Sequence, residues 1–307
     1  MKGPLIINDR DKIEAAYAAS LQYLGEQIEL QEKITDALLA YHEIGSLIPQ
    51  TATNVLSGHY LPYSESYLDL ESSLQLCMEG FYKYAFMALR SVLELGILGV
   101  NFAADDREHE EVRPWLASQT RIRFKKTLKR IERLNNFEKF DDRFGLSKRI
   151  ETTYDSMCAF VHTRGYLHTS QGIAGSNYNR FSTKSFNRYC EVMPSVVSDV
   201  IIVLLLKYPI GLQSLPLFEK FGLNGPAGGF LDSDEVESIT AILHPEERNF
   251  LKQLSDNDPN VRSIKEQIES MPDISEEELK RQSNELYMEM KISEPGMKNR
   301  DRDKSLN

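Results

Sequence analysis

Cysteine is scarce in this sequence: its 307 residues contain three thiols, at Cys77, Cys158 and Cys190. An odd number of cysteines without paired spacing excludes a disulfide framework and argues against a structural zinc site. Each thiol lies within a helical pattern of apolar residues. We therefore predict three buried, reduced cysteines that act as small apolar side chains.

Long apolar runs are missing as well. The longest, residues 200–206, is far shorter than the ~20 apolar residues that a membrane span requires. The chain also does not open like a signal peptide, because charged residues follow directly after Leu5–Ile7. We expect a cytoplasmic protein that does not engage a membrane.

Positive charge is in short supply too. The formal net charge is -10 and the pI is about 5.3, which argues against a protein whose whole surface wraps nucleic acid. One stretch differs, with seven cations in thirteen residues: Arg121, Arg123, Lys125, Lys126, Lys129, Arg130 and Arg133. Two interpretations stay open: a solvated face that packs against acidic helices of the same protein, or a stripe that attracts RNA or another anionic ligand.

The alternation typical of strands is nearly absent, whereas helical periodicity recurs along the chain, so we predict an all-α fold. The expected helical segments cover residues 12–47, 66–102, 146–165 and 185–207, and short capped helices follow residue 231. The predicted organisation is a helical bundle over residues 1–212, a helical C-terminal extension over 213–292 and a disordered tail over 293–307.

The segment 66–102 contains no proline, and its second half is apolar on most sides, as in a helix buried by its neighbours. Arg90 and Glu94 interrupt this apolar half, one helical turn apart on the same face. The same face continues through Glu79, Lys83 and Asn101. A desolvated charge costs several kcal/mol unless it is paired, so this polar seam predicts partners on another helix.

Residues 146–165 offer such partners. Tyr154 and His162 recur on one face about two turns apart, on a helix that we expect to face the polar seam. One interpretation is a buried Arg90–Glu94 ion pair, completed by hydrogen bonds from the phenol and the imidazole, that only fixes helix register. The other is a ligand-binding or catalytic site.

No metal or cofactor site is predicted. His109 lies among consecutive acids that would fan out around a helix axis. Residues 256–260 resemble the start of a calcium loop, but Val261 and Gln267 replace its glycine and its bidentate acid. The glycines of residues 222–229 lack the preceding strand and the following Lys-Ser/Thr of a phosphate loop.

Two segments carry a resemblance to a known group of proteins. The first is residues 80–98, which contain Arg90-x-x-x-Glu94, and the second is residues 154–165, which contain Tyr154, His162, Thr163 and Arg164. Together with Lys207–Pro209, they resemble bacterial families with a HEPN-like helical bundle (higher eukaryote and prokaryote nucleotide-binding). The similarity extends over about residues 66–209.

The resemblance implies a four- or five-helix up-and-down bundle that forms a homodimer. Active members are metal-independent ribonucleases, many of them toxins or antiphage defence effectors with an antitoxin or another defence partner. Their signature is an arginine and a histidine separated by four to six residues. Arg164 and His168 are the nearest such pair here, with three residues between them.

Metal-free RNA cleavage needs a base for the 2′-hydroxyl, an acid for the leaving oxygen and a cation for the phosphorane. The candidate catalytic residues are Arg90, Glu94, Tyr154, His162, Arg164 and His168. The candidate RNA- or phosphate-binding residues are Arg121, Arg123, Lys125, Lys126, Lys129 and Arg130. The alternative function is a noncatalytic bundle that binds RNA, a nucleotide or a protein partner.

Overall fold

The computed structural model describes residues 10–48, 60–105, 110–175, 179–223, 229–282 and 284. Within this part of the chain the regular elements are all helices, which confirms the predicted all-α class. The predicted disordered tail (293–307), His109 and part of the glycine-rich connector (224–228) lie outside the described residues.

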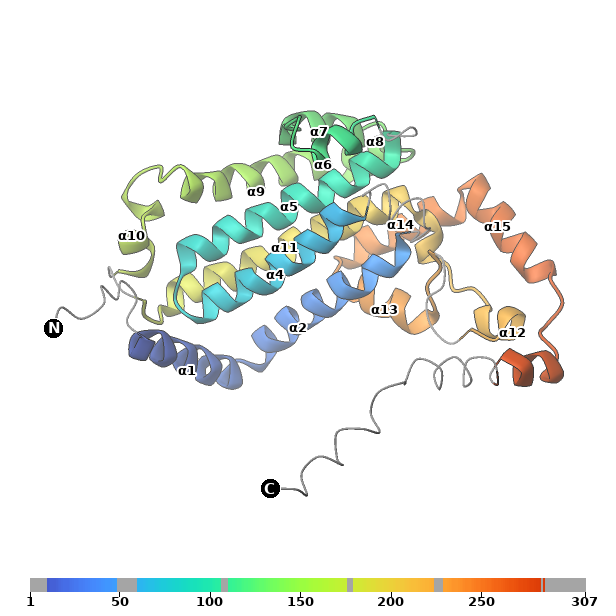
Figure 1. The fold of residues 1–307 in the computed structure, drawn as a ribbon, viewed down its shortest axis with the longest axis horizontal. Helices are drawn as coiled ribbons and strands as arrows, with labels where there is room; N and C mark the ends of the chain where they lie inside the picture. The colour runs from blue at the N-terminus through green and yellow to red at the C-terminus, as the bar shows by residue number, and fades with distance from the viewer. Residues whose placement is uncertain are drawn as a thin grey trace, which may run out of the picture.

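Five long helices form the bundle shown in Figure 1: α2 (Ile28–Glu43), α4 (Leu61–Met78), α5 (Tyr82–Asp105), α9 (Leu146–Val161) and α11 (Thr183–Lys207). They alternate in direction along the chain, so α4 and α5 are antiparallel. In contrast, α5 and α11 lie side by side in the same direction: Tyr82 contacts Ser182, and the ring of Phe86 contacts that of Tyr189. Central in this arrangement is α5, which packs against α4, α9 and α11.

Further helices surround the bundle. On the N-terminal and middle parts they are α1 (Arg10–Glu26), η1 (Ile44–Leu47), α6 (Val112–Leu116), α7 (Phe124–Ile131), α8 (Phe137–Phe144), η2 (Tyr166–His168) and α10 (Ser170–Ala174). On the C-terminal part they are η3 (Pro209–Leu212), α12 (Leu217–Phe221), α13 (Ser233–Ala241), α14 (Pro245–Asp256) and α15 (Pro259–Ser270).

Two helices in the described part of the chain are long and apolar enough to cross a membrane by length and composition alone. They are Tyr82–Ala103 and Thr183–Lys207, and 67% and 78% of their most apolar stretches are buried inside the molecule. Burial of this extent is typical of the core helices of a soluble protein. The helix α11 continues through Pro194. Cys77, Cys158 and Cys190 are buried, as predicted.

The predicted single helix over residues 66–102 is wrong, because the chain turns back at Gly80. Gly80 has φ +80°, in the left-handed region that glycine tolerates best. The N–H of Gly80 donates to the carbonyl of Cys77 at 3.0 Å, and the N–H of Phe81 donates to that of Leu76 at 2.8 Å. This is a Schellman motif, which closes α4 and sends α5 back along it.

Substitution of Gly80 by alanine is expected to destabilise the protein by more than about 1 kcal/mol. The left-handed φ disfavours alanine, and a β-carbon there would lie 2.9 Å from backbone atoms of Arg180, which cannot move away as a side-chain end would. Chemical denaturation measures the effect. Gly25→Ala in α1 is the matched control, since its β-carbon would meet nothing within 4 Å and alanine favours a helix. Equal stabilities of the two variants would contradict the prediction.

The C-terminal helices begin at strong local caps. Asp232 accepts from the backbone N–H of Glu235 while the Glu235 carboxylate accepts from the N–H of Asp232, both at 3.0 Å, forming a capping box before α13. Asp258 accepts from the N–H groups of Asn260 and Val261 at 2.9 and 3.3 Å. The acids that resemble a calcium loop therefore include the residue that begins α15.

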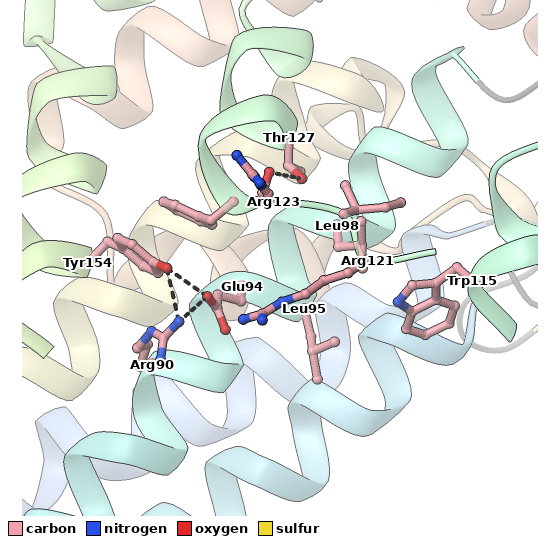
Figure 2. A pocket seen from close by; sticks show the side chains of 11 residues that line it. Arg90, Glu94, Leu95, Leu98, Trp115, Arg121, Arg123, Thr127 and Tyr154 are labelled. Carbon is pink, nitrogen blue, oxygen red and sulfur yellow. Dashed lines mark hydrogen bonds and ion pairs between the residues drawn. The ribbon is translucent and has the colours of Figure 1, made fainter. Parts of the chain in front are cut away.

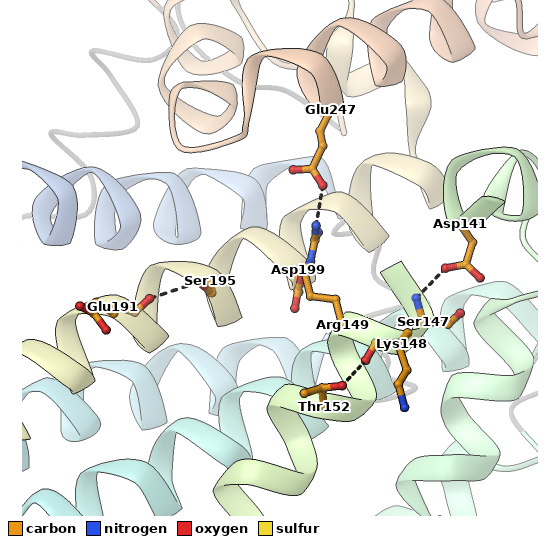
Figure 3. Close-up of polar contacts among 9 residues, drawn as sticks. All are labelled: Asp141, Ser147, Lys148, Arg149, Thr152, Glu191, Ser195, Asp199 and Glu247. Atoms are coloured by element: carbon orange, nitrogen blue, oxygen red, sulfur yellow. Dashed lines mark hydrogen bonds and ion pairs between the residues drawn. The ribbon is translucent and has the colours of Figure 1, made fainter. Parts of the chain in front are cut away.

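A buried ion triad joins the C-terminal extension to the bundle (Figure 3). Arg149 on α9 donates through Nε to Asp199 on α11 and through Nη1 to Glu247 on α14, each at 2.6 Å. The two carboxylates are 1% and 8% exposed. Burial raises the pKa of Asp199 to about 6, although the charge of Arg149 acts in the opposite direction. One guanidinium thus connects three helices that are distant in sequence.

Candidate functional site

Arg90 and Glu94 of the polar seam face α9, where they form a three-residue cluster, whereas Glu79 lies before α5 and the buried side-chain amide of Asn101 has no hydrogen-bond partner among the described residues. Arg90 Nη2 donates to Glu94 Oε1 at 2.6 Å and to the Tyr154 hydroxyl at 2.9 Å. That hydroxyl in turn donates to the same oxygen of Glu94 at 2.9 Å. Arg90 and Glu94 lie one turn apart on α5, and α9 positions Tyr154 across from them (Figure 2).

The protonation states of the cluster follow from its contacts. Burial opposes the charge of Arg90, but the hydrogen bond with Tyr154 and the charge of Glu94 outweigh burial and raise the pKa of the guanidinium. Burial also raises the pKa of Tyr154, and its hydrogen bond to Glu94 adds to the effect. Arg90 is therefore charged at neutral pH, and Tyr154 is a neutral hydrogen-bond donor.

Aromatic stacking connects this cluster to α7. The rings of Phe124 and Tyr154 are nearly parallel, with centroids 4.0 Å apart and an interplanar angle of 15°. Phe124 is the first residue of α7, so the segment that precedes this helix lies beside the cluster. Arg121 and Arg123 belong to that segment. Stacking therefore holds the segment with Arg121 and Arg123 at the same pocket that Arg90 lines.

These residues enclose an open pocket of about 570 Å³. Its polar lining consists of Arg90, Glu94, Arg121, Arg123, Thr127 and Tyr154. Its apolar lining consists of Leu95, Leu98, Trp115, Ile122 and Phe124. Figure 2 shows Arg121 extended across the pocket towards Glu94, with Trp115 at the end away from Arg90 and Tyr154. The volume is in the range of small-molecule sites.

The basic segment 121–133 divides into groups with different surroundings. Arg130 and Lys126 both pair with Glu111, which lowers the pKa of that carboxyl mainly through its hydrogen bond with Arg130. Two other lysines of α7, Lys125 and Lys129, are exposed and have no side-chain partner among the described residues. Arg121 and Arg123 line the pocket. Pairing with an acid of the same protein thus holds for Lys126 and Arg130, and attraction of RNA or another anionic ligand stays a prediction for the other residues.

His162, Arg164 and His168 lie elsewhere, and the expected meeting of the His162 imidazole with Arg90 is wrong. His162 is an exposed residue at the C-terminal end of α9, eight residues after Tyr154. At the helical rise this is about 12 Å along the axis. None of the three lines the pocket. The neighbouring Thr163 instead accepts a hydrogen bond from Lys83 of α5 at 2.9 Å.

Arg164 and His168 belong to one local turn. Nδ1 of His168 lies 2.6 Å from the backbone carbonyl oxygen of Arg164, and the imidazole packs edge-on against Phe160 with centroids 4.9 Å apart. The Arg164 side chain is exposed. Arg164 and His168 are therefore close to each other within a local turn, and the imidazole of His168 packs against the ring of Phe160.

Trp115, Phe124 and Thr127 line the pocket but were not predicted from the sequence as site residues. Aromatic residues inside the basic stretch are a signal that could have indicated them, because aromatic and basic residues together are typical of nucleic-acid sites. Within the described ranges, no group of three or more His, Cys, Asp or Glu residues could hold a metal ion.

Fold and site together define an all-α bundle with an arginine-rich pocket between α5, α7 and α9. Comparison with known proteins gives no match: no family model, no curated protein and no solved structure is significantly similar to the chain.

Proposed function

We propose that this chain is a HEPN-like helical-bundle protein that binds RNA or a nucleotide in the pocket between α5, α7 and α9, without cleaving it. The observation that carries this proposal is the set of three guanidinium groups, Arg90, Arg121 and Arg123, gathered around one cavity with an aromatic end. The guanidinium group is planar and presents paired N–H donors that match phosphate oxygens. Trp115 supplies a face for stacking a base.

The three arginines differ in whether their side chains already have hydrogen-bond or ion-pair partners. Arg90 is committed to Glu94 and Tyr154, so it fixes the floor of the pocket and neutralises the carboxylate. Arg121 and Arg123 are exposed, and among the described residues their side chains have no hydrogen-bond or ion-pair partner. These two are the groups proposed to contact phosphate.

Binding can be measured through Trp115, which is the single tryptophan of the chain. A single-stranded RNA is expected to change its fluorescence, and Arg121→Ala or Arg123→Ala should each weaken binding roughly 10- to 100-fold. The reason is that a hydrogen bond from a charged donor contributes about 1.5–3 kcal/mol. Lys125→Ala is the matched control, because this exposed lysine follows Phe124 on α7 and does not line the pocket. Equal losses in all three variants would indicate a diffuse charge effect and count against the site.

Metal-independent RNA cleavage is the second candidate function. It is favoured by the contact of the Tyr154 hydroxyl with a carboxylate and a guanidinium in one pocket. The described residues that line the pocket include no histidine, so Glu94 would serve as the base and Tyr154 as the acid. The resemblance alone supports a role as a toxin or antiphage effector, a homodimeric state and an antitoxin partner.

A cleavage assay with varied RNAs and no added metal separates the candidates. If cleavage occurs, Glu94→Gln should abolish it while His162→Ala leaves it unchanged, because His162 is distant from the pocket. If His162→Ala alone lost cleavage, the catalytic site would lie at the C-terminal end of α9. Binding without cleavage across all RNAs would support the noncatalytic function.

A further inference from the structure

The described lining of the pocket carries a net positive charge. Its lining contains three guanidinium groups and one carboxylate, which leaves a formal charge of +2. Arg90 neutralises Glu94 through a contact of 2.6 Å. The net charge therefore belongs to Arg121 and Arg123, the two exposed arginines before and at the start of α7.

A phosphodiester and a phosphate monoester differ in how they would bind to Arg121 and Arg123. An internal phosphodiester carries one negative charge, whereas a phosphate monoester carries about -1.5 to -2 near neutral pH and offers three acceptor oxygens. Two guanidinium forks provide more paired donors than the two non-bridging oxygens of a diester can use. Charge and donor geometry both favour the monoester.

The rest of the lining accommodates an attached nucleoside. Leu95, Leu98, Trp115 and Ile122 form apolar walls, and Figure 2 shows Trp115 on the far side of Arg121 from the Arg90 cluster. A base stacked on the indole would place its sugar and phosphate towards the arginines. A carboxylate such as Glu94 accepts hydrogen bonds from sugar hydroxyls or base amino groups.

We propose that the pocket binds a nucleoside phosphomonoester, either a free nucleotide or the phosphorylated end of an RNA strand, and discriminates against internal phosphodiesters. This inference rests on the proposed function, since it names the ligand class of the same site. It differs from general RNA binding because the affinity depends on one terminal phosphate.

The full-length protein is titrated with adenosine 5′-monophosphate, its 3′,5′-cyclic diester and adenosine, with Trp115 fluorescence as the readout. The monoester is expected to bind at least roughly tenfold more tightly than either of the others. The same ratio is expected between one RNA oligonucleotide with a 5′-phosphate and the same strand with a 5′-hydroxyl. Arg123→Ala should remove both preferences, and Lys148→Ala, at an exposed lysine of α9 that does not line the pocket, should keep them.

A pH series adds an independent readout. The second ionisation of a phosphate monoester has a pKa of about 6, so lowering the pH from about 7.5 to about 5.5 should weaken binding of the monoester. Among the described residues that line the pocket, the charged and titratable groups are Arg90, Glu94, Arg121, Arg123 and Tyr154. The cyclic diester does not titrate in this range, so it reports any change in the protein itself.

Each result has a defined meaning. Tighter binding of the phosphorylated strand than of the mononucleotide would identify an RNA end, and the reverse would identify a free nucleotide; both support the inference. Equal affinities for monoester and diester, both dependent on Arg123, would overturn it and leave the proposed function intact. Absence of binding by every RNA and nucleotide would overturn the two together.

Discussion

Replacement of Arg149 by alanine is expected to lower the free energy of unfolding by about 3 kcal/mol or more, the lower end of the range for breaking a buried ion pair. The variant leaves Asp199 and Glu247, which are 1% and 8% exposed, without their shared partner. The Arg149 side chain is itself 34% exposed, so water replaces part of the lost interaction. Denaturant unfolding measures the change directly.

Lys148→Ala is the matched control for this experiment. Lys148 precedes Arg149 on α9 and is exposed, so its removal should change stability by less than about 0.5 kcal/mol. In a further variant, Asp199→Asn and Glu247→Gln accompany Arg149→Met, which removes all three charges and should recover much of the loss. A decrease below about 1 kcal/mol for Arg149→Ala would show that the triad does not hold α14 against the bundle.

The stability of the protein is expected to fall relative to that of Asp199→Asn as the pH rises from about 4 to about 7. Burial raises the pKa of Asp199 to about 6 from an ordinary value of 3.8. Between these values the folded protein keeps a proton that the unfolded chain releases, so the contribution of Asp199 is largest below the unfolded pKa and decreases through the folded one. A difference of about 2 between the two pKa values corresponds to about 3 kcal/mol.

The measurement is a set of denaturant titrations of both proteins at several pH values across this window. Comparison with Asp199→Asn cancels the groups that titrate independently of Asp199. Asp142→Asn is the matched control, since Asp142 is exposed on α8, and its stability should stay parallel to that of the unaltered protein. A constant difference between the unaltered protein and Asp199→Asn at all pH values would refute the raised pKa.

Local features of the fold could be predicted well from the sequence. The helical periodicity indicated the long helices, and the capping residues before α13 and α15 were visible because a cap involves neighbouring residues. The contact between Arg90 and Glu94 was predictable for the same reason, since a helix brings residues four apart together. The turn at Gly80 was predictable as well, because a glycine just after a helix is typical of a helix C-terminus.

The expected position of His162 could have been corrected from geometry alone. Eight residues of helix separate it from Tyr154, and that length of about 12 Å does not allow both side chains to reach Arg90 from α9. A partner for Asp199 could also have been expected from the sequence. A single acid within the apolar stretch of α11 requires a partner, as Arg149 proves to be.

By itself the sequence determined the all-α class, the capped start of α13 and the Arg90–Glu94 pair, because periodicity, caps and contacts within a helix depend on residues close in the chain. Only the tertiary structure decided that Tyr154 completes this pair, that Arg121 and Arg123 join it in one pocket, and that Arg149 connects α11 with α14. These contacts depend on how separate helices pack, and packing is set by the shape and burial of the whole core rather than by any local pattern.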